Sequence, residues 1–285
     1  MEIRTVGIVG AGQMGSGIAQ VAAAAGFDVL LTDIDAEVLE RGLRMVARNL
    51  DRQTEKGQAE AGEKTAVLDR IAASTHVSEH RRADLVIESA VESLPIKAEI
   101  FRQLDLLCPP QTLFASNTSS ISITRLAAAT TRPDRFLGMH FMNPAPVMRL
   151  VEIIRGLETS EQTVESARGV AQSMGKTPVE CNDWPGFVAN RLLMPMINEA
   201  AFAVAEGIAT PESVDQIMTL GMNHPMGPLR LADLIGLDNV LKVMRILHEE
   251  FGDPKYRPCP LLVKMVDGGR LGRKSGQGFF SYSED

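Results

Sequence analysis

Short apolar runs alternate with longer amphipathic stretches along roughly the first 180 residues of the chain. Runs rich in apolar and β-branched residues predict strands at 5–9, 28–32, 85–88, 112–115, 136–141, 149–154 and 177–180. Apolar residues at helical spacing predict helices between them, at 15–25, 36–56, 96–107 and 161–174. Alternation of this kind is typical of a parallel sheet covered by helices on both faces, so we expect an α/β domain of the doubly wound type.

The pattern changes at 182–186, where the sequence Asn-Asp-Trp-Pro-Gly favours a turn. Helical spacing follows at 187–206, after Thr210-Pro211 and at 238–251. Pro195 falls inside the first of these stretches, where it predicts a kink or a late helix start. We therefore expect an α/β domain at 1–183 and an all-helical domain at 184–285, whose broad apolar faces favour packing against a second subunit.

Composition excludes several classes of function. The 285 residues include 29 Lys and Arg against 36 Asp and Glu, so the formal net charge is −7 and no overall basic field exists to bind nucleic acid. No apolar run is long enough to cross a membrane, and the first residues lead into a predicted strand rather than a signal peptide. The cysteines Cys108, Cys181 and Cys259 form no CxxC pair, which disfavours a zinc site and favours a reducing, cytoplasmic compartment.

A glycine motif follows the first predicted strand. Gly10, Gly12 and Gly15 form GxGxxG at the start of a predicted helix, and the second predicted strand leads to Asp33. Gly10 permits a tight turn, Gly12 lets a pyrophosphate approach the backbone, and Gly15 allows the helix to pack closely on the strand. The Asp33 carboxylate suits an adenosine ribose and would repel a 2′-phosphate, which favours NAD over NADP. The alternative is a glycine-rich turn that binds no ligand.

His140 ends an apolar predicted strand, and the next predicted strand carries one acid, Glu152. If the two strands fold back at Pro146, His140 and Glu152 become cross-strand neighbours. A carboxylate bound to one imidazole nitrogen raises the basicity of the other, which suits removal of a hydroxyl proton. The alternative is an ion pair that only ties the strands together. The other histidines are predicted at solvated positions or in a turn, namely His76, His80, His248 and His224.

A polar segment, Ser116-Asn117-Thr118-Ser119-Ser120, follows another predicted strand. Open α/β sheets bind ligands at the carboxyl ends of their strands, so these hydroxyl and amide groups are candidates for contact with a cofactor or a carbonyl oxygen. The alternative is an ordinary helix cap.

A cationic stripe lies on one face of the predicted helix 36–56. Its members recur at spacings of three and four residues and are Arg41, Arg44, Arg48, Arg52 and Lys56. In an acidic protein such a stripe suits a phosphate-rich ligand such as coenzyme A. Acids lie nearby in the sequence, so a solvated charged face is the alternative.

Together these motifs resemble the 3-hydroxyacyl-CoA dehydrogenase family, most closely its short bacterial-type members that act on 3-hydroxybutyryl-CoA. The matching segments are GAGQMGSGIA from Gly10, VIESAVE from Val86, SNTSS from Ser116, HFMNPAPVM from His140, PGFVANR from Pro185, HPMGP from His224 and GRKSGQGFF from Gly272. The resemblance implies a Rossmann-type first domain and a helical second domain that forms a homodimer. It implies NAD-dependent, reversible oxidation of an (S)-3-hydroxyacyl-CoA to the 3-ketoacyl-CoA.

The resemblance also implies roles for individual residues. His140 matches the family's catalytic base and Glu152 its orienting acid, whereas Ser119 and Asn190 match residues that contact the C3 oxygen and thioester region of the substrate. Family positions that line the NAD site fall on Gln13, Met14, Glu92, Lys97, Asn117, Ser119, Asn143 and Lys274.

Three positions depart from the family pattern. Met142 stands where the family often has a second aromatic residue, which affects only the lining of the pocket. Gly42 and Asn49 stand where longer-chain members have a Ser and a Lys that contact coenzyme A. We therefore expect coenzyme A to be contacted by Arg48, Asn49, Arg52 or Lys56.

Other functions use the same residues. A thioester hydrolase with a Ser119, His140 and Glu152 triad lacks the GxSxG elbow and leaves the glycine motif unexplained. A non-enzymatic NAD-binding protein is disfavoured by the intact His140, Glu152 and Asn190. A dehydrogenase of a hydroxy acid without coenzyme A is disfavoured by the cationic stripe.

Overall fold

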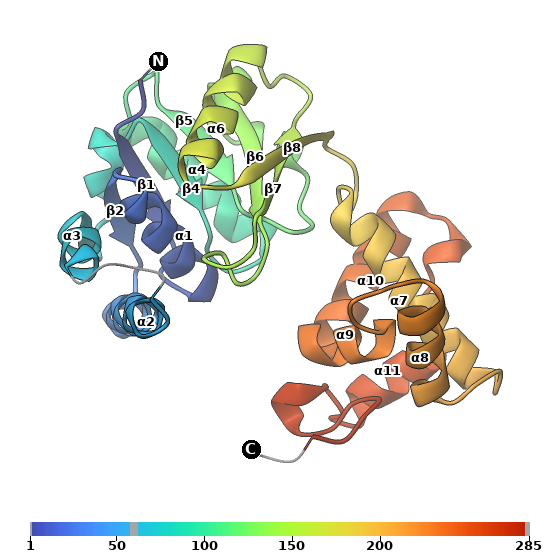
Figure 1. The fold of residues 1–285 in the computed structure, drawn as a ribbon. Coiled ribbons are helices and arrows are strands. Elements are labelled where there is room, and N and C mark those ends of the chain that lie inside the picture. Colours follow the sequence, from blue (N-terminus) through green and yellow to red (C-terminus); the bar gives the residue numbers. More distant parts are fainter. Residues whose placement is uncertain (1, 58–61, 283–285) are drawn as a thin grey trace. The chain divides into compact units, whose positions relative to one another are not determined.

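The computed structural model describes residues 2–57 and 62–282, and the chain divides into two compact units, Met1–Trp184 and Pro185–Asp285 (Figure 1). Each unit has a hydrophobic core of its own. Among the described residues, no helix is both long and apolar enough to span a bilayer.

The first unit is built on one twisted sheet. Its strands are β1 (Thr5–Val9), β2 (Asp28–Thr32), β3 (Ile71–Ser74), β4 (Leu85–Glu88), β5 (Leu113–Ser116), β6 (Phe136–Phe141), β7 (Leu150–Arg155) and β8 (Thr177–Asn182). They lie in the order β3-β2-β1-β4-β5-β6-β7-β8. All neighbouring pairs are parallel except β6 and β7, which are antiparallel.

Helices cover both faces of this sheet, as Figure 1 shows. They are α1 (Gln13–Ala24), α2 (Ala36–Glu55), α3 (Glu63–Asp69), α4 (Leu94–Leu107), α5 (Ile123–Ala127) and α6 (Glu161–Ser173). Alternate residues of β6 reach opposite faces. Leu137 joins the core formed with α1 and α6, whereas the Phe136 ring packs 4.5 Å, centroid to centroid, from Phe101 of α4. Burial on both faces explains why these strands are almost wholly apolar.

The second unit is helical. It contains α7 (Ala189–Ala205), α8 (Pro211–Gly221), α9 (Pro228–Ile235), α10 (Leu237–Phe251) and α11 (Pro260–Asp267). Buried aliphatic residues such as Ile197, Leu241 and Leu262 form its core. Helix α7 begins before Pro195, so the predicted late start is wrong.

The predicted architecture, a Rossmann-type sheet followed by a helical region, is confirmed. Predicted strands and helices agree with the observed ones to within two residues at most ends. Strand β3 was missed because it lies at the sheet edge, where only Ile71 among its four residues is a large apolar one. Edge strands are not buried on both faces, so they lack the apolar signal of central strands.

His80 is buried rather than solvated, which corrects the sequence prediction. It belongs to a 3₁₀ turn (Val77–Arg82), and its Nε2 lies 2.8 Å from Thr32 Oγ1. A Cβ atom on Gly7 of β1 would stand 2.3 Å from His80 Nδ1, so the glycine makes room for the ring. Burial lowers the pKa of His80 to about 4. A charged, polar local sequence gave no sign of this long-range contact.

Candidate active site

The glycine loop joins β1 to α1 with the geometry that each glycine was predicted to allow. Gly10 has φ +99°, where a side chain would be strained. A Cβ atom on Gly15 would stand 1.8 Å from Gly10 O, so only glycine lets the helix approach the strand. A Cβ atom on Gly12 would meet nothing within 4 Å, which leaves an open surface beside the amide groups that begin α1.

Asp33 follows β2 and lies against this loop. One oxygen, Oδ2, accepts a hydrogen bond of 2.8 Å from Ala11 N, and the carboxylate remains half-exposed. The first turn of α1 also presents Gln13, which is exposed, and Met14, which is half-buried. An open backbone surface at a helix N-terminus beside an acidic residue fits the pyrophosphate and ribose of a dinucleotide.

The glycine loop contacts the end of the neighbouring strand β4. A Cβ atom on Gly10 would stand 2.6 Å from Ser89 O. The strand order reverses between β1 and β4, because β2 and β3 extend from one side of β1 and β5 and β6 from the other. This is the point at which sheets of this type bind ligands, so the loops after β1 and β4 form one candidate site.

A buried charged cluster lies after β4. Lys97 Nζ is 2.6 Å from Glu88 Oε1 and 3.4 Å from Glu92 Oε2, and it donates to Ala90 O at 3.2 Å. Burial raises the pKa of the Glu88 carboxyl above its ordinary value despite the nearby ammonium. Burial alone would also raise the pKa of Glu92, but Lys97 and hydrogen bonds from Thr118 and Ser120 bring it below its ordinary value.

Lys97 donates hydrogen bonds to Glu88 and Ala90 and forms an ion pair with Glu92, and its side chain is 1% exposed. The resemblance implied that Lys97 lines the NAD site. In the structure, Lys97 directly contacts Glu88, Ala90 and Glu92 and holds these residues in place.

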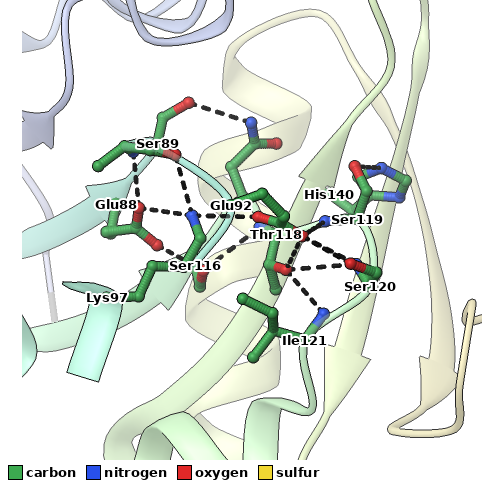
Figure 2. Close-up of polar contacts among 12 residues, drawn as sticks. Glu88, Ser89, Glu92, Lys97, Ser116, Thr118, Ser119, Ser120, Ile121 and His140 are labelled. Carbon is green, nitrogen blue, oxygen red and sulfur yellow. Dashed lines mark hydrogen bonds and ion pairs between the residues drawn. The ribbon is translucent and has the colours of Figure 1, made fainter. Parts of the chain in front are cut away.

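Glu92 in turn holds the polar segment Ser116–Ser120, which begins at the last residue of β5, as Figure 2 shows. Its Oε1 accepts hydrogen bonds from Thr118 Oγ1, Ser119 N, Ser120 N and Ser120 Oγ. On the other side, Ser116 Oγ donates to Glu88 Oε2 at 2.7 Å and accepts from Thr118 N. Two carboxylates therefore fix the segment that presents Ser119.

Ser119, His140 and Glu152 form a continuous hydrogen-bonded chain. His140 and Glu152 are register partners across β6 and β7, which confirms the predicted cross-strand pairing. His140 Nδ1 lies 2.8 Å from Glu152 Oε2, and His140 Nε2 lies 3.0 Å from Ser119 Oγ. The imidazole is 6% and the carboxylate residue 3% exposed. A buried carboxylate on Nδ1 leaves Nε2 as the basic nitrogen, and that nitrogen faces the hydroxyl of Ser119.

Two amide side chains join this chain to the loops around it. Asn117 Oδ1 accepts from Phe141 N at 2.8 Å, and Asn117 Nδ2 donates to Ser89 Oγ at 3.2 Å. Asn143, in the connection from β6 to β7, accepts from Gln13 Nε2 at 3.1 Å. Both predicted cofactor residues thus lie between the His140 strand and the loops at the strand-order reversal.

Two predicted site residues belong to the second unit. Asn190 lies in the first turn of α7 and is half-buried. Lys274 lies in a 3₁₀ turn (Arg273–Ser275), and its Nζ is 2.6 Å from Asp238 Oδ1.

Some members of the cationic stripe on α2 form ion pairs within the described part of the chain, and others do not. Arg41 lies 3.7 Å from Glu37, and Arg44 pairs with Glu40. Arg48, Arg52 and Lys56 are exposed and have no carboxylate partner among the described residues.

Two of the three departures from the family pattern, Gly42 and Asn49, face α1 and the glycine loop. Asn49 donates to Gln20 Oε1 at 3.2 Å, so its amide is engaged within the unit. A Cβ atom on Gly42 would stand 2.6 Å from Ala11 O, which explains a glycine there.

Comparison with known families agrees with this geometry. The family model for the NAD binding domain of 3-hydroxyacyl-CoA dehydrogenase matches residues 5–184, and the model for the C-terminal domain of the same enzyme matches residues 186–282. The chain belongs to the 3-hydroxyacyl-CoA dehydrogenase family. It is therefore an NAD-dependent oxidoreductase, as the glycine loop and Asp33 predicted.

Relatives of this dehydrogenase are similar over their whole length. A Bacillus subtilis (strain 168) protein named probable 3-hydroxybutyryl-CoA dehydrogenase is 56% identical, with 100% of this chain and 99% of that protein covered. The 3-hydroxybutyryl-CoA dehydrogenase of Bradyrhizobium diazoefficiens is 51% identical, with coverage of 98% and 96%. The crystal structure of (S)-3-hydroxybutyryl-CoA dehydrogenase from Ralstonia eutropha has a TM-score of 0.97 at 50% identity and covers 99% of this chain and 100% of its own.

Sequence reasoning missed Glu88 of this dehydrogenase, and it predicted a ligand contact for Ser116 rather than a hydrogen bond to that carboxylate. Both end apolar strands, and both are 0% exposed. The available signal was a carboxylate at the carboxyl end of a strand next to β1, where a buried acid needs polar partners.

Proposed function

We propose that this dehydrogenase oxidises the C3 hydroxyl of (S)-3-hydroxyacyl-CoA reversibly, with NAD, and that short-chain 3-hydroxybutyryl-CoA is its preferred substrate. The observation that carries the proposal is the chain from Glu152 through His140 to Ser119, next to loops suited to a dinucleotide. The full-length relatives named for 3-hydroxybutyryl-CoA support the short-chain assignment.

In this proposal His140 Nε2 removes the proton of the C3 hydroxyl. Glu152, bound to Nδ1, stabilises the imidazolium that results and keeps the ring oriented. The hydroxyl of Ser119, 3.0 Å from Nε2, donates a hydrogen bond to the C3 oxygen once substrate displaces the ring as its partner. Asn190 contributes the contact to the thioester region. NAD, when bound, would supply the acceptor for the hydride that leaves C3.

In this proposal the first domain, 1–183, supplies all the cofactor contacts except that of Lys274. Gly10, Gly12 and Gly15 accommodate the pyrophosphate and Asp33 the adenosine ribose. The remaining cofactor contacts come from Gln13, Met14, Glu92, Asn117, Ser119, Asn143 and Lys274, with Lys97 acting through Glu92. The second domain, 184–285, contributes to substrate binding and dimerisation.

Coenzyme A phosphates are bound in this proposal by Arg48, Arg52 and Lys56, because these members of the stripe have no carboxylate partner within 2–57 and 62–282. Asn49 is the weaker candidate, since its amide already contacts Gln20.

A homodimer forms in this proposal through the helical domain. Ile217 and Leu220 lie three residues apart on α8, hence on one helix face, and are 59% and 86% exposed. Ile208, in the turn before α8, is 73% exposed. Large apolar residues at this exposure favour a protein interface. The buried thiols of Cys108 and Cys259 favour a reducing, cytoplasmic location.

The test is a series of kcat/KM values for hydroxyacyl-CoA substrates from C4 to C16, followed by NADH absorbance, with NAD and NADP compared. We expect the highest value at the short-chain end, with NAD. Release of free coenzyme A without added nucleotide would instead identify a Ser119 hydrolase and contradict the proposal. A kcat/KM that is highest for long-chain substrates would overturn only the short-chain assignment and would leave the proposed reaction in place.

A further inference from the structure

Lys176 is a buried lysine in the first unit, outside the residues assigned above. It follows α6 directly after Gly175, and the residue is 9% exposed. Its Nζ donates to the backbone oxygens of Ala145 and Met148. No carboxylate lies within ion-pair distance of it in the described parts of the chain.

A buried ammonium without a carboxylate partner is costly. Burial lowers the pKa of Lys176 below its ordinary value, as this cost requires. An apolar residue would fill the same space without that cost. What the ammonium adds is a pair of directional hydrogen bonds to one connection, residues 142–149, which joins β6 to β7.

The same connection lies against the glycine-motif helix. A Cβ atom on Gly17 of α1 would stand 3.1 Å from Pro146 Cδ and 3.2 Å from Ala145 Cβ. At its other end, Asn143 accepts the hydrogen bond from Gln13 in the first turn of α1. Lys176 therefore donates hydrogen bonds to the same connection that packs against α1.

We propose that Lys176 is a positioning residue for the cofactor site, which holds connection 142–149 against α1 so that Asn143 stays beside Gln13. The inference rests on the proposed function in one respect, the role of Asn143 toward NAD. His140 and Glu152 are register partners in the β6–β7 ladder, whereas Lys176 donates only to Ala145 and Met148 of the connection, so loss of those hydrogen bonds leaves the pairing in place. Lys176 thus affects cofactor binding rather than proton transfer.

The test is Lys176→Met, which keeps an unbranched side chain, one atom shorter than that of lysine, and removes the donor. We expect the Kd for NADH, measured by fluorescence titration, and the KM for NAD to rise about tenfold, because two hydrogen bonds to the connection are lost. We expect kcat at saturating NAD to stay within about twofold. A purely structural role would instead lower the melting temperature and the active fraction with no change in Kd. Equal Kd values for wild type and folded variant overturn the inference.

Two further variants make the result specific. Lys242→Met, at an exposed lysine of α10, is the control and leaves Kd unchanged. Asn143→Ala is combined with Lys176→Met. We expect the Kd of the double variant for NADH to be no higher than the higher of the two single-variant values, because both changes act through the same contact. Additive losses contradict a route through Asn143.

The outcomes also separate this inference from the proposed function. A wild-type protein that binds no NADH refutes the cofactor site itself, whereas wild-type binding with an unaffected Lys176→Met refutes only the inference. If Lys176→Met does not fold, Lys176→Gln is measured in the same way. Its neutral, shorter side chain does not span both carbonyls, and a Kd within twofold of wild type overturns the inference.

Discussion

Lys97 and Glu88 form an ion pair that water does not reach, with Nζ 2.6 Å from Oε1 and side-chain exposures of 1% and 0%. Glu88 ends β4, and Lys97 lies one helical turn into α4, so the pair joins the strand to the helix that follows it. Through Glu92 and Ser116, the same pair determines where Ser119 lies. The orientation of a residue next to His140 therefore depends on charges buried behind it.

Replacement of Lys97 by Met is expected to lower the free energy of unfolding by about 3–5 kcal/mol, because Glu88 loses its buried counter-ion. Urea denaturation measures the loss. The double variant Lys97→Met/Glu88→Gln regains part of it, since a neutral amide needs no counter-ion. Lys242→Met is the exposed control. A Lys97→Met protein as stable as wild type would show that the pair contributes nothing to stability.

His140→Ala is expected to reduce kcat by about 10²–10⁴-fold and to leave the Kd for NADH nearly unchanged, because the imidazole transfers a proton but does not hold the nucleotide. Steady-state kinetics and fluorescence titration measure the two quantities. His76→Ala, at an exposed histidine, is the matched control and keeps full activity. Turnover of His140→Ala within threefold of wild type would exclude the base assignment.

His80 makes stability depend on pH. Burial lowers the pKa of His80 to about 4, whereas in the unfolded chain the pKa is near the ordinary value of 6.5. The unfolded state therefore binds a proton below pH 6.5 that the folded state does not. The contribution of neutral His80 to the free energy of unfolding is fully present above about pH 6.5. As the pH falls to about 4, the free energy of unfolding decreases by about 3 kcal/mol in total.

The measurement is the free energy of unfolding in urea at several pH values between 4 and 7. His80→Gln is expected to flatten the curve over this range because the titrating ring is gone, whereas His76→Gln keeps the wild-type slope. A wild-type slope in His80→Gln would mean that another group produces the pH dependence.

Arg48→Ala, Arg52→Ala and Lys56→Ala are each expected to raise the KM for the acyl-CoA about fivefold, through a lost contact to phosphate worth about 1 kcal/mol. The KM for NAD stays the same. Arg41→Ala and Arg44→Ala are the controls, since these side chains already pair with Glu37 and Glu40. The effect shrinks at high ionic strength because the cations are exposed. If the Arg41 and Arg44 variants raise the KM for the acyl-CoA as much as the Arg48, Arg52 and Lys56 variants do, coenzyme A is not bound specifically at the end of α2.

Local sequence determined much of this protein. Apolar runs, glycine spacing and turn residues identified the central strands, the glycine loop and the change to helices after Asp183, because each depends on neighbours within a few residues. The pairing of His140 with Glu152 also followed from sequence, since a single turn at Pro146 sets the register of the two strands.

Only the tertiary structure decided which polar residues are buried. Glu88, Lys97, His80 and Lys176 occupy stretches of sequence that look ordinary, and their partners lie on other elements. Whether a charge is solvated, paired or left with backbone carbonyls depends on which segments pack over it, and spacing along the chain does not record that packing.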